Sequence, residues 1–146
     1  MGTATNDFVE VYNFLPQQRI EAIRGGVPAK DVGRLAHSMQ VPKDFLIASL
    51  GLARATLSRK ERSSQSLSSD ESERLLGIKA LIGQVQLMVE QSGGPAGFDA
   101  AHWLAGWLDT PLPALAGRAP ASYMDTVEGQ KLVANLLAMA QSGAYA

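Results

Sequence analysis

Apolar residues recur at steps of three and four along most of the chain, in segments bounded by proline and glycine. This spacing predicts amphipathic helices, because the alternation of β-branched and aromatic residues that is typical of strands is scarce. We predict one helix that starts at Pro16 and ends at Gly25-Gly26, a second that starts at Pro28, and two more over 44–49 and 53–62. The core positions expected in the first two are Ile20, Ile23, Val32, Leu35, Ala36 and Met39.

The small, polar run 63–69, SSQSLSS, is predicted to be a linker. A long helix should follow it, because Ser68 and Glu71 have the spacing of a capping box. The apolar stripe of this helix is wider than one face, so we expect neighbours on more than one side. The stripe consists of Leu75, Ile78, Ile82, Val85 and Val89, widened by Leu76, Leu81, Leu87 and Met88.

The run 92–97, SGGPAG, ends the long helix, and two further helices are predicted beyond it. Asp99 can cap a helix that carries Trp103, Leu104, Trp107 and Leu108, and that Pro111 and Pro113 close. Tryptophans four apart are typical of core packing, although binding hot spots are also rich in tryptophan, and both interpretations stay open.

A short helical stretch with Tyr123 precedes the last helix, which Thr126 can cap and Gly143 can end. Its expected core positions are Val133, Leu136, Leu137 and Ala140. The pattern as a whole predicts an all-α protein with an N-terminal domain over 1–67 and a second domain, with the long helix, over 68–146.

Composition narrows the class of protein. The chain is 46% hydrophobic, enough for a packed core, and has no cysteine, which is compatible with a reducing cytoplasm. No apolar stretch approaches the roughly 20 residues that cross a bilayer, and the N-terminus lacks the pattern of a signal peptide. We therefore expect a soluble, cytoplasmic protein without a membrane partner.

Residues 48–60, ASLGLARATLSRK, have the pattern of a helix-turn-helix motif. Gly51 allows a turn with positive φ, and the flanking leucines would hold the second helix so that its other face enters a major groove of DNA. On that face Arg54, Ser58 and Arg59 could reach base edges, while Lys60 and Arg62 are better placed for phosphates. The flanking leucines are Leu46, Leu50, Leu52 and Leu57.

A helical hairpin with a solvated basic face is the alternative interpretation of this segment. The net charge of −1 argues neither way, because acidic residues at 70–73 balance the basic ones at 54–62. One residue departs from the common motif, in which alanine stands four positions before the glycine. Here Ile47 stands there, so the two helices could cross more widely.

Enzymatic chemistry finds little support in the sequence. His37 and His102 lie on different segments and no cysteine accompanies them, so neither a zinc site nor a catalytic Cys/His pair is indicated. The run 92–97 lacks the Gly-Lys-Ser/Thr ending of a phosphate-binding loop. We predict no catalytic residues, no metal and no cofactor, and a structural, partly buried role for His102.

Residues 98–146 resemble the C-terminal toxin-binding domain of the MbcA/ParS/Xre antitoxin family, and the helix-turn-helix region upstream agrees with that family's layout. Only residues 1–15 fall outside the resemblance. The matching motifs, in order, are Trp107-Leu108, Pro113-Ala114-Leu115, Gly117-Arg118-Ala119-Pro120, Asp125-Thr126, Glu128-Gly129 and Gly143-Ala144-Tyr145.

The resemblance implies an antitoxin of a type II toxin-antitoxin system. Such antitoxins neutralise a RES-domain toxin that consumes NAD⁺ by covering its active site, form homodimers within the complex, and bind operator DNA to repress their own promoter. The residues it implies for toxin contact are Arg118, Tyr123, Gly143, Tyr145 and Ala146. The alternative is a stand-alone helix-turn-helix regulator whose C-terminal domain dimerises or senses a ligand.

Overall fold

The computed structural model describes residues 3–142, and the side chains of residues 7–140. The described chain is helical, with two isolated β-bridges and no strand, which confirms the all-α prediction. Its elements are α1 (Thr3–Tyr12), α2 (Pro16–Gly25), α3 (Asp31–Met39), α4 (Lys43–Ser49), α5 (Arg54–Arg62), α6 (Ser69–Gln91), α7 (Ala100–Leu108), η1 (Pro113–Leu115), η2 (Pro120–Tyr123) and α8 (Val127–Ser142).

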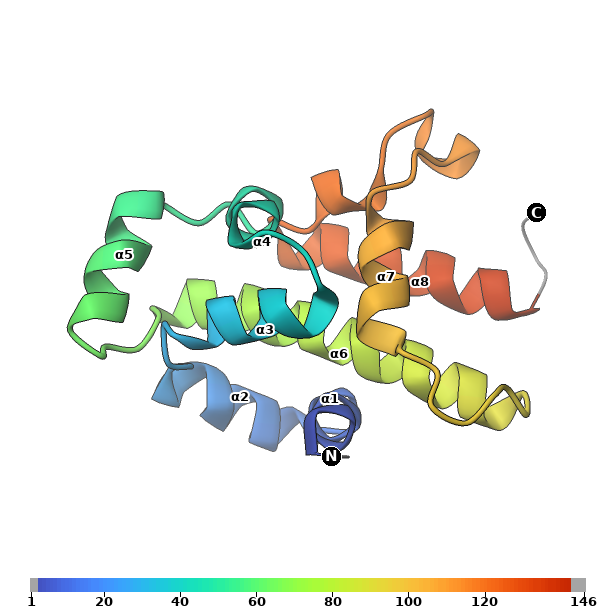
Figure 1. The fold of residues 1–146 in the computed structure, drawn as a ribbon, viewed down its shortest axis with the longest axis horizontal. Helices are drawn as coiled ribbons and strands as arrows, with labels where there is room; N and C mark the ends of the chain where they lie inside the picture. Colours follow the sequence, from blue (N-terminus) through green and yellow to red (C-terminus); the bar gives the residue numbers. More distant parts are fainter. Residues whose placement is uncertain (1–2, 143–146) are drawn as a thin grey trace.

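Helix α6 forms the axis of the fold, as its wide apolar stripe predicted (Figure 1). Helices α1 and α2 pack against it from one side, and α7 and α8 pack against it from another. The predicted capping box is present, since Ser68 Oγ accepts from Glu71 N at 3.1 Å and Glu71 Oε1 accepts from Ser68 N at 2.8 Å. The buried positions of α6 are Ser72, Leu75, Leu76, Ile78, Leu81, Ile82, Gly83, Gln84 and Val85.

Helix α1 contacts α6 at a point where α6 has no side chain. A Cβ atom built on Gly83 would overlap the carbonyl oxygen of Phe8, so the two backbones meet more closely than any other residue would allow. Phe8 and Val11 are buried by this contact. The sequence pattern did not predict this helix.

The polar run 63–69 connects α5 to α6, as predicted for a linker, but it is held in place by contacts with residues 27–29. Leu67 is buried, Leu67 N donates to the Val27 carbonyl at 2.7 Å, and Ala29 N donates to the Gln65 carbonyl at 3.0 Å. Pro28 forms a β-bridge with Ser66, which also explains why α3 begins at Asp31 and not at Pro28. Backbone pairing, which side-chain polarity does not reveal, fixes this connection.

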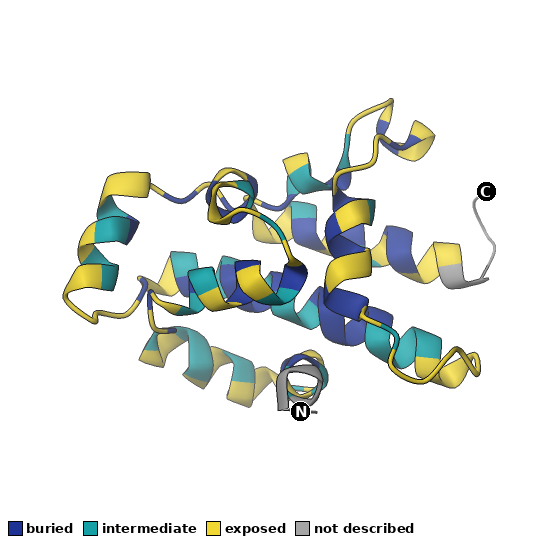
Figure 2. Cartoon of the chain, viewed as in Figure 1, coloured by how far each residue is buried: buried dark blue, intermediate teal, exposed yellow. Residues whose placement is uncertain are grey.

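Most of the predicted core is buried, and Figure 2 shows the buried positions gathered along α6 and its neighbours. The core positions predicted in α3 are confirmed, as are Val133, Leu136 and Leu137 in α8. Ile20 and Ala140 were wrong, because both are exposed. Buried residues from both halves of the chain form one continuous cluster, so the boundary at 67/68 stays a prediction.

Candidate DNA and partner interfaces

Helices α4 and α5 form the predicted helix-turn-helix. Gly51 has φ +65° and the four leucines around it are buried, as the motif requires. Arg74 of α6 donates from Nε to the Leu50 carbonyl at 2.7 Å, which fixes the turn against the centre of the fold. Ile47, the departure from the common pattern, is buried and its carbonyl accepts from Leu52 N at 2.9 Å, so the turn closes despite its bulk.

The basic residues of α5 differ in whether they are exposed and whether they form an ion pair. Arg59 and Arg62 are exposed, and neither forms an ion pair with any described residue. Arg54 is exposed but pairs with Asp44 of α4. Ser58 is half-buried. Arg59 and Arg62 are therefore the cations of α5 that are free to meet DNA.

Lys60 is held inside the fold by an ion pair. Its Nζ lies 2.9 Å from Glu71 Oε1, and the two side chains are only 15% and 13% exposed. Burial raises the pKa of Glu71, but hydrogen bonds from the Ser68 backbone and Lys60, together with the charge of Lys60, outweigh it, so the pKa lies below its ordinary value. This arrangement favours a structural role for Lys60, since it ties α5 to the start of α6, and its phosphate contact stays a prediction.

Arg118 lies in a tight loop between α7 and η2, where it forms a β-bridge with Leu112. Leu112 N donates to the Arg118 carbonyl at 3.0 Å, and Gly117 N donates to the Leu112 carbonyl at 2.9 Å. Gly117 has φ +85°, a conformation that favours glycine. The Arg118 side chain is exposed and pairs with no described carboxylate, so it is free to contact a partner.

The structure gives less support for the other residues expected to contact a toxin. Tyr123 is half-buried and packs against the small cluster of Leu112, Leu115 and Leu136, which indicates a mainly structural role. The expected positions Gly143, Tyr145 and Ala146 lie outside the described residues. Their contacts with a toxin stay predictions.

The structure decides whether Trp103 belongs to the core or to the surface, which the sequence had left open. Trp103 is 42% exposed and stacks on the half-buried Trp107, with ring centroids 6.2 Å apart and planes within 12°. It lines a cavity of about 370 Å³, which we term the aromatic groove. The groove residues are Val85, Met88, Val89, Ser92, Phe98, Trp103 and Ala140. The sequence could have indicated that Trp103 is exposed, because it lies one position away from the buried face of α7 that carries Leu104 and Leu108.

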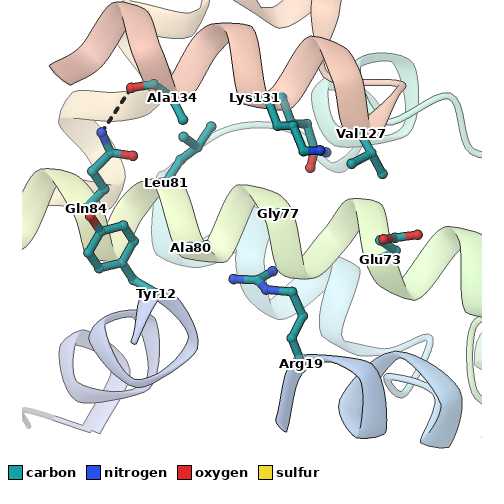
Figure 3. Close-up of a pocket in the computed structure, with 11 residues that line it drawn as sticks. Tyr12, Arg19, Glu73, Gly77, Ala80, Leu81, Gln84, Val127, Lys131 and Ala134 are labelled. Atoms are coloured by element: carbon teal, nitrogen blue, oxygen red, sulfur yellow. Dashed lines mark hydrogen bonds between the residues drawn. The ribbon is translucent and has the colours of Figure 1, made fainter. Parts of the chain in front are cut away.

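A second cavity, of about 280 Å³, lies over α6 between α1 and α2 on one side and α8 on the other (Figure 3). We term it the charged pocket, because three of its side chains are charged and none of them forms an ion pair with a described residue. These are Arg19, Glu73 and Lys131. The remaining lining is Tyr12, Gly77, Ala80, Leu81, Gln84, Val127, Gln130 and Ala134.

His102 has structural contacts. The Asp99 carboxylate caps α7, as predicted, by accepting from His102 N at 3.0 Å, and His102 Nδ1 lies 3.3 Å from the Met39 carbonyl oxygen of α3. His102 itself is exposed, although partial burial was expected. Among the described side chains, those of residues 7–140, no cluster of three or more metal-ligating groups occurs. No helix of the described chain is long and apolar enough to cross a bilayer.

Comparison with known proteins relates both ends of the chain to antitoxins. Residues 18–78 match the antitoxin Xre-like helix-turn-helix domain, and residues 96–143 match the antitoxin Xre/MbcA/ParS C-terminal toxin-binding domain. The chain is also similar to the Prs ADP-ribosylating antitoxin of Sphingobium sp. (strain YBL2), with 43% identity over 99% of this chain and 91% of that protein. The protein therefore belongs to the Xre/MbcA/ParS family of antitoxins, with a helix-turn-helix domain and a toxin-binding domain.

Proposed function

We propose that this antitoxin neutralises a RES-domain toxin that consumes NAD⁺, by covering the toxin's active site. The relative's name refers to ADP-ribosylation. Transfer of ADP-ribose from NAD⁺ also consumes that molecule, so we assign the partner toxin to this reaction class. The antitoxin acts by binding and not by catalysis, in the cytoplasm where its target works.

The aromatic groove is the observation that carries this proposal. Its walls include Phe98, Trp103 and Ala140, which lie inside the segment that matches the toxin-binding domain. A partly exposed tryptophan beside an apolar cavity is costly in a free protein and typical of a binding hot spot. Arg118, exposed and unpaired on the loop beyond α7, adds a charge that suits a nucleotide-binding cleft.

Expression of the toxin that is encoded beside this chain tests the proposal. We expect growth arrest from the toxin alone, relief on co-expression of this chain, and a complex that co-purifies. In a purified mixture, NAD⁺ consumption by the toxin should stop once this chain is in excess. A toxin that stays fully active and unbound under those conditions would contradict the proposal.

We also propose that the antitoxin represses its own promoter as a homodimer. Two copies of α5 would enter successive major grooves of a pseudo-palindromic operator, with half-sites about 34–36 Å apart. The free cations Arg59 and Arg62 support this role, because they stand on the exposed face of α5. Measurement of the mass of the antitoxin in solution gives the number of protomers and tests the homodimer.

Replacing Arg59 by alanine is expected to weaken operator binding by about 1–3 kcal/mol and to relax its sequence preference. The reason is that arginine pairs bidentately with guanine, whereas alanine makes no such contact. Fluorescence anisotropy with the operator and with single-base variants measures both effects. Arg24→Ala, an exposed arginine of α2 outside the motif, is the matched control. Equal weakening over all sequences would make Arg59 a phosphate contact.

A further inference from the structure

The charged pocket joins the two functional halves of the antitoxin. Arg19, Glu73 and Gly77 belong to the segment that matches the helix-turn-helix domain, whereas Val127, Lys131 and Ala134 belong to the toxin-binding domain. Neither DNA contact on α5 nor toxin contact at the aromatic groove uses these residues. A group bound in the pocket would touch both halves at once.

Two cations approach the pocket from opposite walls. Figure 3 shows the Arg19 guanidinium extending from α2 and Lys131 extending from α8 toward the stretch of α6 around Gly77. One Arg19 nitrogen, Nη2, donates to the Val11 carbonyl at 3.3 Å, which leaves most of the five N–H donors of the group available. Arg19 is half-buried and still has no carboxylate partner in the described chain.

The local charge of the pocket is positive, because Arg19 and Lys131 outnumber the single carboxylate of Glu73. Arg19 is half-buried and its one hydrogen bond goes to a neutral carbonyl, whereas Lys131 is exposed at the rim of the pocket. An anion placed between these two cations would gain charge-assisted hydrogen bonds from both. Glu73 stands one helical turn before Gly77 on α6 and could accept a hydrogen bond from a donor on the same molecule.

The rest of the pocket is apolar and small. The Tyr12 ring, Ala80 and Leu81 provide flat and aliphatic surface next to the charges. The volume of about 280 Å³ lies just below the range of about 300–1,000 Å³ for drug-sized ligands. This size suits a compact molecule and leaves no room for a polymer segment with its backbone.

We propose that the charged pocket binds a small organic anion, a carboxylate or a phosphate monoester that carries an apolar or aromatic body. The anionic group lies between Arg19 and Lys131, and the body lies along Tyr12, Ala80 and Leu81. Because the ligand contacts both α2 and α8, its binding stabilises the packing of the helix-turn-helix domain on the toxin-binding domain. The site is independent of the toxin and of the operator.

Titration of the isotope-labelled antitoxin with phenyl phosphate, followed by amide NMR shifts and melting temperature, tests this proposal. We expect saturable shifts at the amides that line the pocket and a rise in melting temperature with ligand concentration. Phenylacetate distinguishes a carboxylate from a phosphate, inorganic phosphate lacks the apolar body, and benzylamine lacks the negative charge. Inorganic phosphate and benzylamine should bind more weakly than the better of the two aromatic anions.

The double variant Arg19→Gln, Lys131→Gln should weaken binding of that aromatic anion at least about tenfold, because it removes two charged hydrogen-bond donors. Arg24→Gln removes an exposed arginine of α2 that does not line the pocket, and it should bind as the unchanged protein does. The proposal is overturned if neither aromatic anion shifts the pocket amides. It is equally overturned if inorganic phosphate binds as tightly as the better of the two aromatic anions, or if Arg24→Gln loses binding as the double variant does. All of these outcomes can be read without toxin or operator.

Discussion

Replacing Trp103 by alanine is expected to weaken toxin binding by more than about 2 kcal/mol, roughly a thirtyfold rise in Kd. The indole is 42% exposed in the free antitoxin, and its surface would be buried when a toxin covers the aromatic groove. Truncation removes that contact and leaves a hole in the interface. Titration calorimetry with the purified toxin measures the loss, and NAD⁺ consumption should return at antitoxin concentrations that otherwise suppress it.

The same substitution should change the fold only slightly. Trp103 does not belong to the buried core, and its loss removes its ring contacts with Phe98 and Trp107, each worth about 0.5–1.5 kcal/mol beyond the area that they bury. Ile20→Ala is the matched control, because Ile20 is 45% exposed but lies on α2, outside the groove. Unchanged toxin affinity in Trp103→Ala, or an equal loss in Ile20→Ala, would remove the aromatic groove from the toxin interface.

The sequence predicted the local features of this fold well. The caps at Ser68, Asp99 and Thr126 depend on residues three positions apart, and all three hydrogen bonds are present. The turn at Gly51 is also a local feature, because its positive φ and the leucines around it lie within twelve residues. The all-α fold and the helix-turn-helix therefore follow from short-range spacing alone.

Long-range contacts account for what the sequence did not predict. The sequence did not show that residues 65–67 are held in place, because their hydrogen-bond partners at 27–29 lie about forty positions earlier. Ile20 is apolar but exposed, because which face of α2 is covered depends on its packing on α6 and not on the local spacing of apolar residues. The charged pocket joins four helices, so no single segment carries its signature.

In the candidate site, too, the sequence predicted the local features, and only the structure shows the long-range contacts. The basic residues of α5 could be identified from the motif, but only the structure shows that Glu71 holds Lys60 whereas Arg59 and Arg62 are free of ion pairs in the described chain. The two tryptophans could be assigned to one helix, but not to core or surface. Periodicity places a residue on a face, and tertiary packing decides what covers that face.

Replacing Gly83 by alanine is expected to destabilise the antitoxin by about 1–3 kcal/mol. Gly83 is buried in the middle of α6, and the new methyl group would overlap the backbone carbonyl of Phe8. A backbone carbonyl cannot rotate away as a side chain can, so α1 must move off α6 and expose Phe8 and Val11. Urea unfolding measures the loss of stability, and hydrogen exchange should show faster exchange in α1 than in α7.

Gly106→Ala provides the control for helix propensity. Gly106 also lies inside a helix, but a Cβ there meets nothing within 4 Å, so alanine should stabilise the protein by about 0.5–1 kcal/mol. The opposite signs of the two variants separate the close approach of α1 from the general effect of removing a glycine. If Gly83→Ala stabilised the protein as Gly106→Ala does, α1 would not be packed on α6 in solution. The covered face of α6 and one wall of the charged pocket would then be open to a partner.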